Sequence, residues 1–292
     1  YGAARAAFWT EMETLSAGDT VDIGFIRAAD RAEATPDLCN LGESAGGYTP
    51  CEVSYTLQPL PGSDFLAYFA FPFTTAIIAL GVGLSLLVFR LKSINALLIA
   101  LFCVSLAVFS AGTFNNATTH NFMFLWLAFV VFGGVAALTL ALTFPTRLGI
   151  TYSQPVVLAV PAVVGGVVLA INLYWYATLP DPTQFTTVWQ VPVTFAFLSF
   201  AALAISLLAR RRYVASSIQR DQVNTTLIGI GLAIVPIFLW MLSNIALVID
   251  SSLVLPLNSA TVMPFFISIP VSMAYAAFQY PAQRSERILS RG

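Results

Sequence analysis

The sequence is poor in charged residues. Only 9% of its 292 residues are charged, whereas 58% are hydrophobic. A soluble globular domain has roughly a quarter of its residues charged, because charged side chains cover its water-facing surface. The composition therefore excludes an ordinary soluble domain and predicts a protein embedded in a lipid bilayer. The formal net charge of -1 gives no electrostatic reason to expect nucleic acid as a partner.

Lysine and histidine are nearly absent, which argues against two kinds of helical membrane protein. The only lysine is Lys92, in a polar joint between apolar runs, whereas a retinal protein needs a lysine amine deep in its last helix. The only histidine is His120, whereas di-haem proteins need several imidazole ligands within their helices. A solvated surface group is the expected role of His120, and a pigment ligand is the alternative. We therefore predict no cofactor and no metal.

Buried ionisable residues and catalytic motifs are also missing. Charged side chains inside the bilayer are costly and usually mark ion or proton routes. Asp181, Asp221 and Asp250 all fall at the ends of apolar runs or in the joints between them. The sequence has no Gly-rich phosphate loop, no HExxH motif and no CxxC pair. We therefore expect neither ion-coupled transport nor enzymatic activity from this chain.

Long apolar runs make up most of the chain. Each is near the ~20 residues that a helix needs to cross a bilayer core. The predicted helices are approximately 65–89, 94–114, 122–144, 155–177, 187–209, 226–249 and 260–280. The expected fold is therefore an all-α polytopic membrane protein of about seven transmembrane helices.

The basic residues beyond the first run occur only in alternate joints. They follow the first, third, fifth and seventh predicted helices, and the other joints have none. They are Arg90, Lys92, Arg147, Arg210, Arg211, Arg212, Arg220, Arg284, Arg287 and Arg291. Cytoplasmic loops carry an excess of Lys and Arg. We therefore predict a multi-pass protein of the bacterial plasma (inner) membrane, with its N-terminus outside and its C-terminus cytoplasmic.

The N-terminal region is acidic and polar. Ten of the fourteen acidic residues lie within the first 64 positions. Alternating apolar residues predict two strands, one over 21–25 and one over 53–57. The sequence thus predicts a small α+β or β-rich extracytoplasmic head over 1–63. A seven-helix membrane domain follows over 64–280, and a cytoplasmic exit linker over 281–292.

Two of the three cysteines, Cys39 and Cys51, lie in this head. A disulfide bond between them would persist in an oxidising compartment, and two free thiols are the alternative. Cys103 falls in the middle of the second predicted helix, where packing is its expected role.

Polar and aromatic residues gather near the predicted external ends of the later helices. Those that we select as a candidate pocket for a small amphipathic ligand are Asn172, Trp175, Trp189, Gln190, Asn244 and Asn258. The alternatives are an aromatic belt that anchors helices at the membrane surface and hydrogen bonding between helices. The same helices contain Pro161, Pro192, Pro236, Pro264 and Pro270, which predict either fixed bends or hinges.

Several short segments resemble parts of bacterial sensor proteins. Residues 15–21 (LSAGDTV) resemble the Gly-Asp-hydrophobic turn of PDZ-like domains, and residues 52–61 (EVSYTLQPLP) resemble the closing strand of such a domain. Residues 269–280 (IPVSMAYAAFQY) and 285–291 (SERILSR) are similar to a last input helix and its exit linker, and residues 220–223 (RDQV) fit the same pattern. The head has no recognisable carboxylate-binding loop, in which it departs from PDZ-like domains.

The chain thus resembles the membrane-input half of competence-type quorum-sensing histidine kinases and related multi-helix sensors. The resemblance implies that the external face recognises a signal and that the last helix passes a rearrangement to a cytoplasmic kinase, phosphatase or cyclase module. Output would then pass through the segment that carries Arg284, Arg287 and Arg291. The sequence has no HExxN segment and no ATP-binding glycine box before it stops at Gly292. We therefore expect a fragment of a longer protein or a chain that acts through partners.

The leading functional hypothesis is a sensor input module without catalytic activity. Its expected partners are the lipid bilayer, a small amphipathic or peptide ligand, and a cytoplasmic signalling module. The alternative is a non-catalytic structural subunit of a larger respiratory or photosynthetic membrane complex, with other membrane subunits as partners. A third hypothesis is an uncoupled facilitator for an apolar solute.

Overall fold

The structure is a computed structural model of the chain. It describes residues 14–28, 39, 48–59, 61–90, 93–117, 122–145, 154–178, 185–213, 216–249 and 262–279. The chain divides into two compact units, Tyr1–Gly62 and Ser63–Gly292, which we describe separately.

The first unit contains a two-stranded antiparallel ribbon of β1 (Thr20–Ala28) and β2 (Tyr48–Thr56), as predicted. The register pairs Val21 with Tyr55, Ile23 with Val53 and Phe25 with Cys51. Because side chains alternate between the two faces of a strand, these six residues share one apolar face. Asp22 and its partner Ser54 lie on the other face with Glu52, and there the Ser54 hydroxyl donates to Asp22 at 2.5 Å.

The predicted disulfide bond is confirmed. Cys39 and Cys51 are bonded with a sequence separation of 12. Both are buried, and Phe25 packs against them. An isolated two-stranded ribbon is only marginally stable in water, so this cross-link and its apolar cover stabilise the strand pair.

The second unit is helical, and five of its helices are long and apolar enough to cross a membrane, at 62–90, 94–115, 123–143, 156–178 and 188–213. They correspond to the first five predicted spans. The elements in order are α3 (Gly62–Phe65), η2 (Leu66–Ala70), α4 (Phe71–Arg90), α5 (Ile94–Ala117), α6 (Met123–Thr143), α7 (Gln154–Thr178), α8 (Phe185–Tyr213), α9 (Ser217–Ile249), η4 (Met263–Ile267) and α11 (Ser268–Gln279). The protein is therefore a multi-pass membrane protein.

The last two predicted spans differ from the expectation. The sixth, 226–249, lies within the longer helix α9, which begins at Ser217. The seventh, 260–280, contains η4 and α11, and the apolar helix described there covers only 264–278. The first turns of α9 are polar and come before its apolar run. Hydropathy alone therefore cannot locate the residue at which this helix begins.

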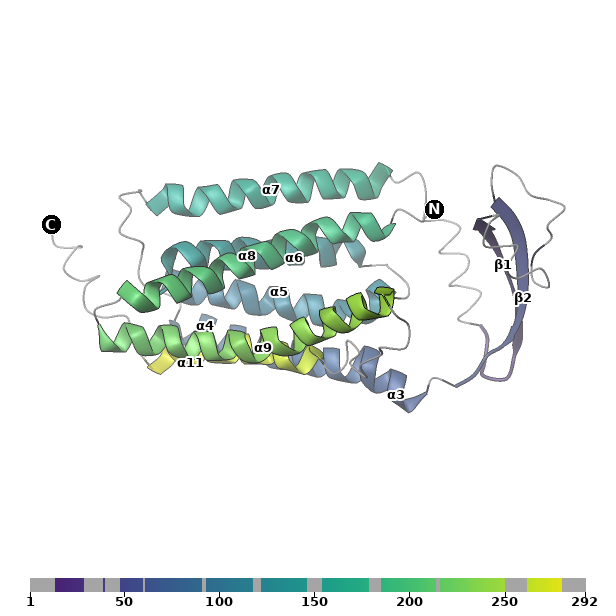
Figure 1. Ribbon diagram of the computed structural model, residues 1–292, viewed down its shortest axis with the longest axis horizontal. Coiled ribbons are helices and arrows are strands. Elements are labelled where there is room, and N and C mark those ends of the chain that lie inside the picture. Colours follow the sequence, from purple (N-terminus) through teal and green to yellow (C-terminus); the bar gives the residue numbers. More distant parts are fainter. Residues whose placement is uncertain are drawn as a thin grey trace. The chain divides into compact units, whose positions relative to one another are not determined.

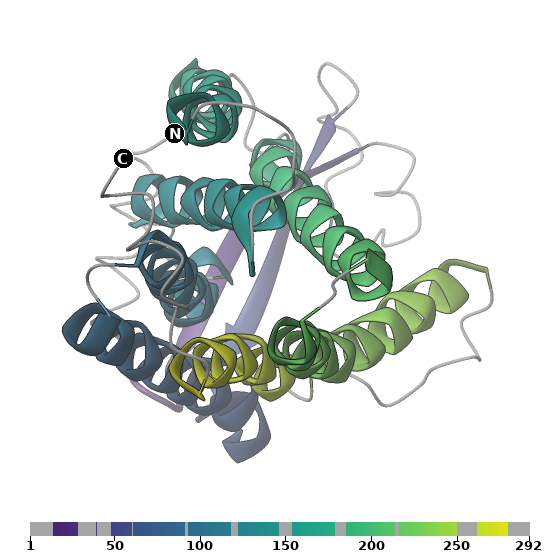
Figure 2. The same cartoon turned by 90° about the vertical axis from the view of Figure 1, so that its left-hand side faces the viewer.

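The helices pack side by side, with α6 as the most buried of the five spans (Figures 1 and 2). Helix α6 contacts α5, α7 and α8, whereas α4 packs on α5. Helix α11 packs on α9 and also contacts α4 and α5. Helix α7 lies at the edge of the bundle (Figure 2) and is the least buried span.

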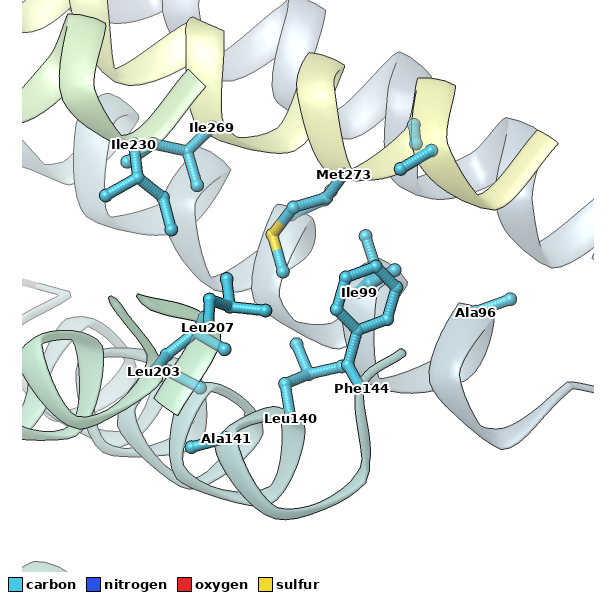
Figure 3. Close-up of a cluster of buried hydrophobic side chains, with 14 of the residues drawn as sticks. Ala96, Ile99, Leu140, Ala141, Phe144, Leu203, Leu207, Ile230, Ile269 and Met273 are labelled. Carbon is cyan, nitrogen blue, oxygen red and sulfur yellow. The ribbon is translucent and has the colours of Figure 1, made fainter. Parts of the chain in front are cut away.

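The main core lies where α5, α6, α8, α9 and α11 meet. In Figure 3, Met273 of α11 points toward Leu207 of α8, with Phe144 and Ile99 beside it. All four side chains are buried. Small residues let helices approach closely elsewhere in the bundle, since a Cβ at Gly133 would lie 3.0 Å from Cβ of Ser105.

Candidate functional site

Asn172 is a fully buried polar side chain in α7. Its Nδ2 donates a hydrogen bond to the backbone carbonyl of Val188 in α8. In an α-helix that carbonyl would accept from the N–H of residue 192. Residue 192 is Pro192, which lies inside α8 and has no N–H. Asn172 therefore supplies the donor that the proline removes, and it joins α7 to α8 at this level.

The second polar atom of this amide is unused. Among the residues that the structure describes, Oδ1 of Asn172 has no hydrogen-bond donor. The amide is held in place through Nδ2, so the direction of Oδ1 is fixed as well. A buried acceptor without a donor destabilises a fold. A fixed, unused acceptor is suited to the O–H or N–H group of a small molecule.

Aromatic side chains from five elements lie at the same end of the bundle, where α5 and α7 end and α6 and α8 begin. This aromatic cluster consists of Phe109, Trp126, Tyr176, Trp189 and Phe266. Trp126 stacks on Phe109 with ring centroids 5.5 Å apart and donates from Nε1 to the Phe109 carbonyl at 3.1 Å. Tyr176 and Trp189 pack against the buried group that contains Trp126.

The aromatic cluster reaches the helical segment over Met263–Gln279. The ring centroids of Phe109 and Phe266 lie 6.4 Å apart. Phe266 belongs to η4, which is followed directly by α11. Side chains in contact thus extend from α7 and α8 through α6 and α5 to η4, which directly precedes α11.

The six predicted pocket residues do not share one environment in the structure. Asn172 contacts the turn of α8 that carries Trp189 and Gln190; Trp189 is half-buried against the aromatic cluster, and Gln190 is exposed. Trp175 lies on the exposed surface of α7. Asn244 belongs to α9, but its side chain lies outside the described residues, as does the whole of Asn258.

The predicted output residues Arg284, Arg287 and Arg291 also lie outside the described residues.

A buried arginine was not selected from the sequence. Arg210 of α8 is 6% exposed, and it donates to the carbonyls of Phe144 at 2.5 Å and Ala141 at 2.7 Å. The Ala141 carbonyl lies four residues before Pro145, so it too lacks a helical donor, and the Ser206 hydroxyl also donates to it at 2.6 Å. The spacing from carbonyl to proline is visible in the sequence, but the donors come from a helix more than 60 residues away.

Comparison of the chain with protein-family models, with curated proteins and with solved structures finds no match.

Proposed function

We propose that the chain is the membrane input module of a sensor, which passes an external signal to a cytoplasmic output partner or domain and has no catalytic activity of its own. The observation that supports this proposal is the aromatic cluster, which joins α7 and α8 to η4, the segment directly before α11. A ligand that moved α7 against α8 would shift Trp189 against Trp126. That displacement would reach Phe266 through Phe109.

The ligand class follows from the chemistry around Asn172. Its unused Oδ1 accepts a hydrogen bond, and the rings nearby favour an apolar or aromatic body. We propose a small amphipathic molecule with one O–H or N–H donor, which enters from the external side of the bilayer. Trp175 of α7 and Gln190 of α8 are exposed and would be the first of the six residues to meet it.

The resemblance of residues 269–280 and 285–291 to a sensor's last helix and exit linker supports a bacterial signalling role. It favours a histidine kinase as the output partner, which would make this chain part of a two-component system.

A fusion experiment tests the proposal. The full chain is joined after Gly292 to a histidine-kinase core and challenged with an organic extract of spent growth medium. We expect kinase output to respond, and Asn172→Leu to abolish the response. Val167→Leu serves as the control, because Val167 lies on the exposed surface of α7. Failure of the fusion to respond to extracts from any growth phase would refute the sensor function.

The structural-subunit hypothesis is favoured by one other observation. Helix α7 has a continuous exposed apolar surface formed by Val156, Val160, Val163, Val167 and Ile171, which would fit a neighbouring subunit as well as lipid. Purification from the native membrane distinguishes the two hypotheses. Other membrane subunits in fixed stoichiometry, together with loss of the complex on deletion of this chain, would favour the subunit.

A further inference from the structure

The last turn of α11 is held by side chains from two other helices. The last four carbonyls of a helix have no intrahelical donor. Arg90, the final residue of α4, donates from Nη2 to the carbonyl of Phe278 at 3.0 Å. Gln222 of α9 donates from Nε2 to the carbonyl of Ala276 at 3.3 Å. Two of the exposed carbonyls of α11 are thus bonded by α4 and α9.

Ring contacts reinforce the same end of α11. The Arg90 guanidinium lies 6.0 Å from the centre of the Phe278 ring, a distance at which a cation and a ring attract. The Phe89 ring meets the Phe278 ring edge-on, with centroids 6.3 Å apart. Arg90 therefore fixes both the backbone and the side chain of Phe278.

The beginning of α11 is fixed in another way. The Ser268 hydroxyl donates to the Gly229 carbonyl of α9 at 2.7 Å. A Cβ at Gly229 would collide with Ser272, so α9 and α11 touch there without any gap. In the middle, Met273 is buried in the main core. Ala276 in the last turn is also buried in that core. The last turn therefore differs from the middle of α11 by the added side-chain hydrogen bonds from Arg90 and Gln222.

We propose that Arg90 and Gln222 form a clasp on the last turn of α11 and that release of this clasp is the step that carries the signal out of the membrane. The proposal rests on the proposed sensor function. Each hydrogen bond shifts an equilibrium by about one order of magnitude, and a charge-assisted bond by up to two. A ligand that distinguishes two states by a similar factor can therefore open or close the clasp, whereas it could not extract Met273 from the core.

Hydrogen exchange measured by mass spectrometry tests whether the clasp exists, with the full chain in lipid nanodiscs. We expect Arg90→Leu and Gln222→Leu each to speed exchange in the last turn of α11 by about tenfold and to leave α5 and α6 unchanged. Arg90→Lys, which keeps a donor, should retain most of the protection. Arg212→Leu is the control, because Arg212 is an exposed residue at the end of α8. Unchanged exchange in both leucine variants would overturn the clasp, as would an equal effect of Arg212→Leu.

The kinase fusion without added extract tests the signalling role of the clasp. Arg90→Leu and Gln222→Leu should shift basal output in the same direction, and Arg212→Leu, at an exposed residue of α8, should leave it unchanged. Faster exchange with unaltered basal output would overturn the role in output and leave the sensor function standing. If the parent fusion ignores every extract, the sensor function fails, and with it the role of the clasp in output. The hydrogen-exchange measurement would still show whether Arg90 and Gln222 hold the last turn of α11.

Discussion

At the scale of single residues, polar side chains from neighbouring helices bond the backbone carbonyls that proline leaves without a donor. Pro192 and Pro145 each remove the N–H that the carbonyl four residues earlier would use. The Val188 carbonyl receives Asn172, and the Ala141 carbonyl receives Ser206 and Arg210. In lipid, a carbonyl without a donor is costly, so each polar side chain has a role that its own position in the sequence does not reveal.

The pairing of Asn172 with Pro192 is testable by a double-mutant cycle. Asn172→Leu should lower the free energy of unfolding in detergent by about 1–2 kcal/mol, because the Val188 carbonyl loses its donor. Pro192→Ala restores an N–H within α8, so in that background the cost of Asn172→Leu should nearly vanish. Thermal unfolding of the four proteins measures both values. Equal costs in the two backgrounds would contradict the assignment.

The buried arginine allows a second prediction. Arg210→Met should lower the free energy of unfolding by about 3 kcal/mol, because the carbonyls of Ala141 and Phe144 lose charge-assisted donors. Arg211 is the next residue of α8 and is exposed. Arg211→Met should therefore change stability by no more than about 0.5 kcal/mol. The same unfolding assay compares the two variants. Similar losses of stability in both would contradict the prediction, because they would show that burial of the side chain does not decide the effect.

At the scale of elements, close approach of α9 and α11 depends on one glycine. Gly229→Ala places a Cβ where Ser272 lies, so we expect it to destabilise the protein by about 1–3 kcal/mol through overpacking. Gly231 lies two residues further along α9 and has open space at its Cβ position. Gly231→Ala should be neutral or stabilising by up to about 1 kcal/mol, since alanine favours helix. Unfolding measurements that rank the two variants in the reverse order would contradict this packing.

The disulfide bond is an element-scale constraint on the head. Reduction, or Cys39→Ser, should destabilise the pairing of β1 and β2 by roughly 3 kcal/mol, the value expected for a closed loop of this length. The helices form a separate compact unit and should keep their exchange protection. Exchange measured by mass spectrometry in the presence and absence of a reductant reports both units at once. Unchanged protection of β1 after reduction would show that the strands do not need the cross-link.

Most of the helices and strands could be predicted from the sequence, but few of the contacts between them could. Apolar length located the five long spans, and the alternating residues located both strands. The beginning of α9 was missed, because its first turns carry Gln222 and other polar residues that hydropathy counts as a joint. Asn172 was selected for its polarity, but its partnership with Val188 depends on how α7 is rotated against α8. That rotation is set by packing between helices far apart in the chain.

At the scale of the whole molecule, orientation in the membrane is a prediction from the basic residues. We test it with single cysteines introduced at Thr20 and at Arg211, both of which are exposed. Cys39 and Cys51 are bonded and Cys103 is buried, so none of the native cysteines should react. In right-side-out vesicles, an impermeant maleimide should label Thr20→Cys at once and Arg211→Cys only after permeabilisation. The opposite pattern would invert the topology.

The contact of α11 with α4 and α5 has a consequence for biosynthesis. A membrane chain is inserted from its N-terminus onward, so α4 and α5 enter the bilayer well before α11 is made. Until then, the surfaces that Met273 and its neighbours later cover face lipid or chaperones, and Arg90 has no Phe278 carbonyl to bind. Helix α11 is thus translated after the two helices whose packing it completes, and a chain that stalls before residue 263 would leave that face of α4 and α5 uncovered.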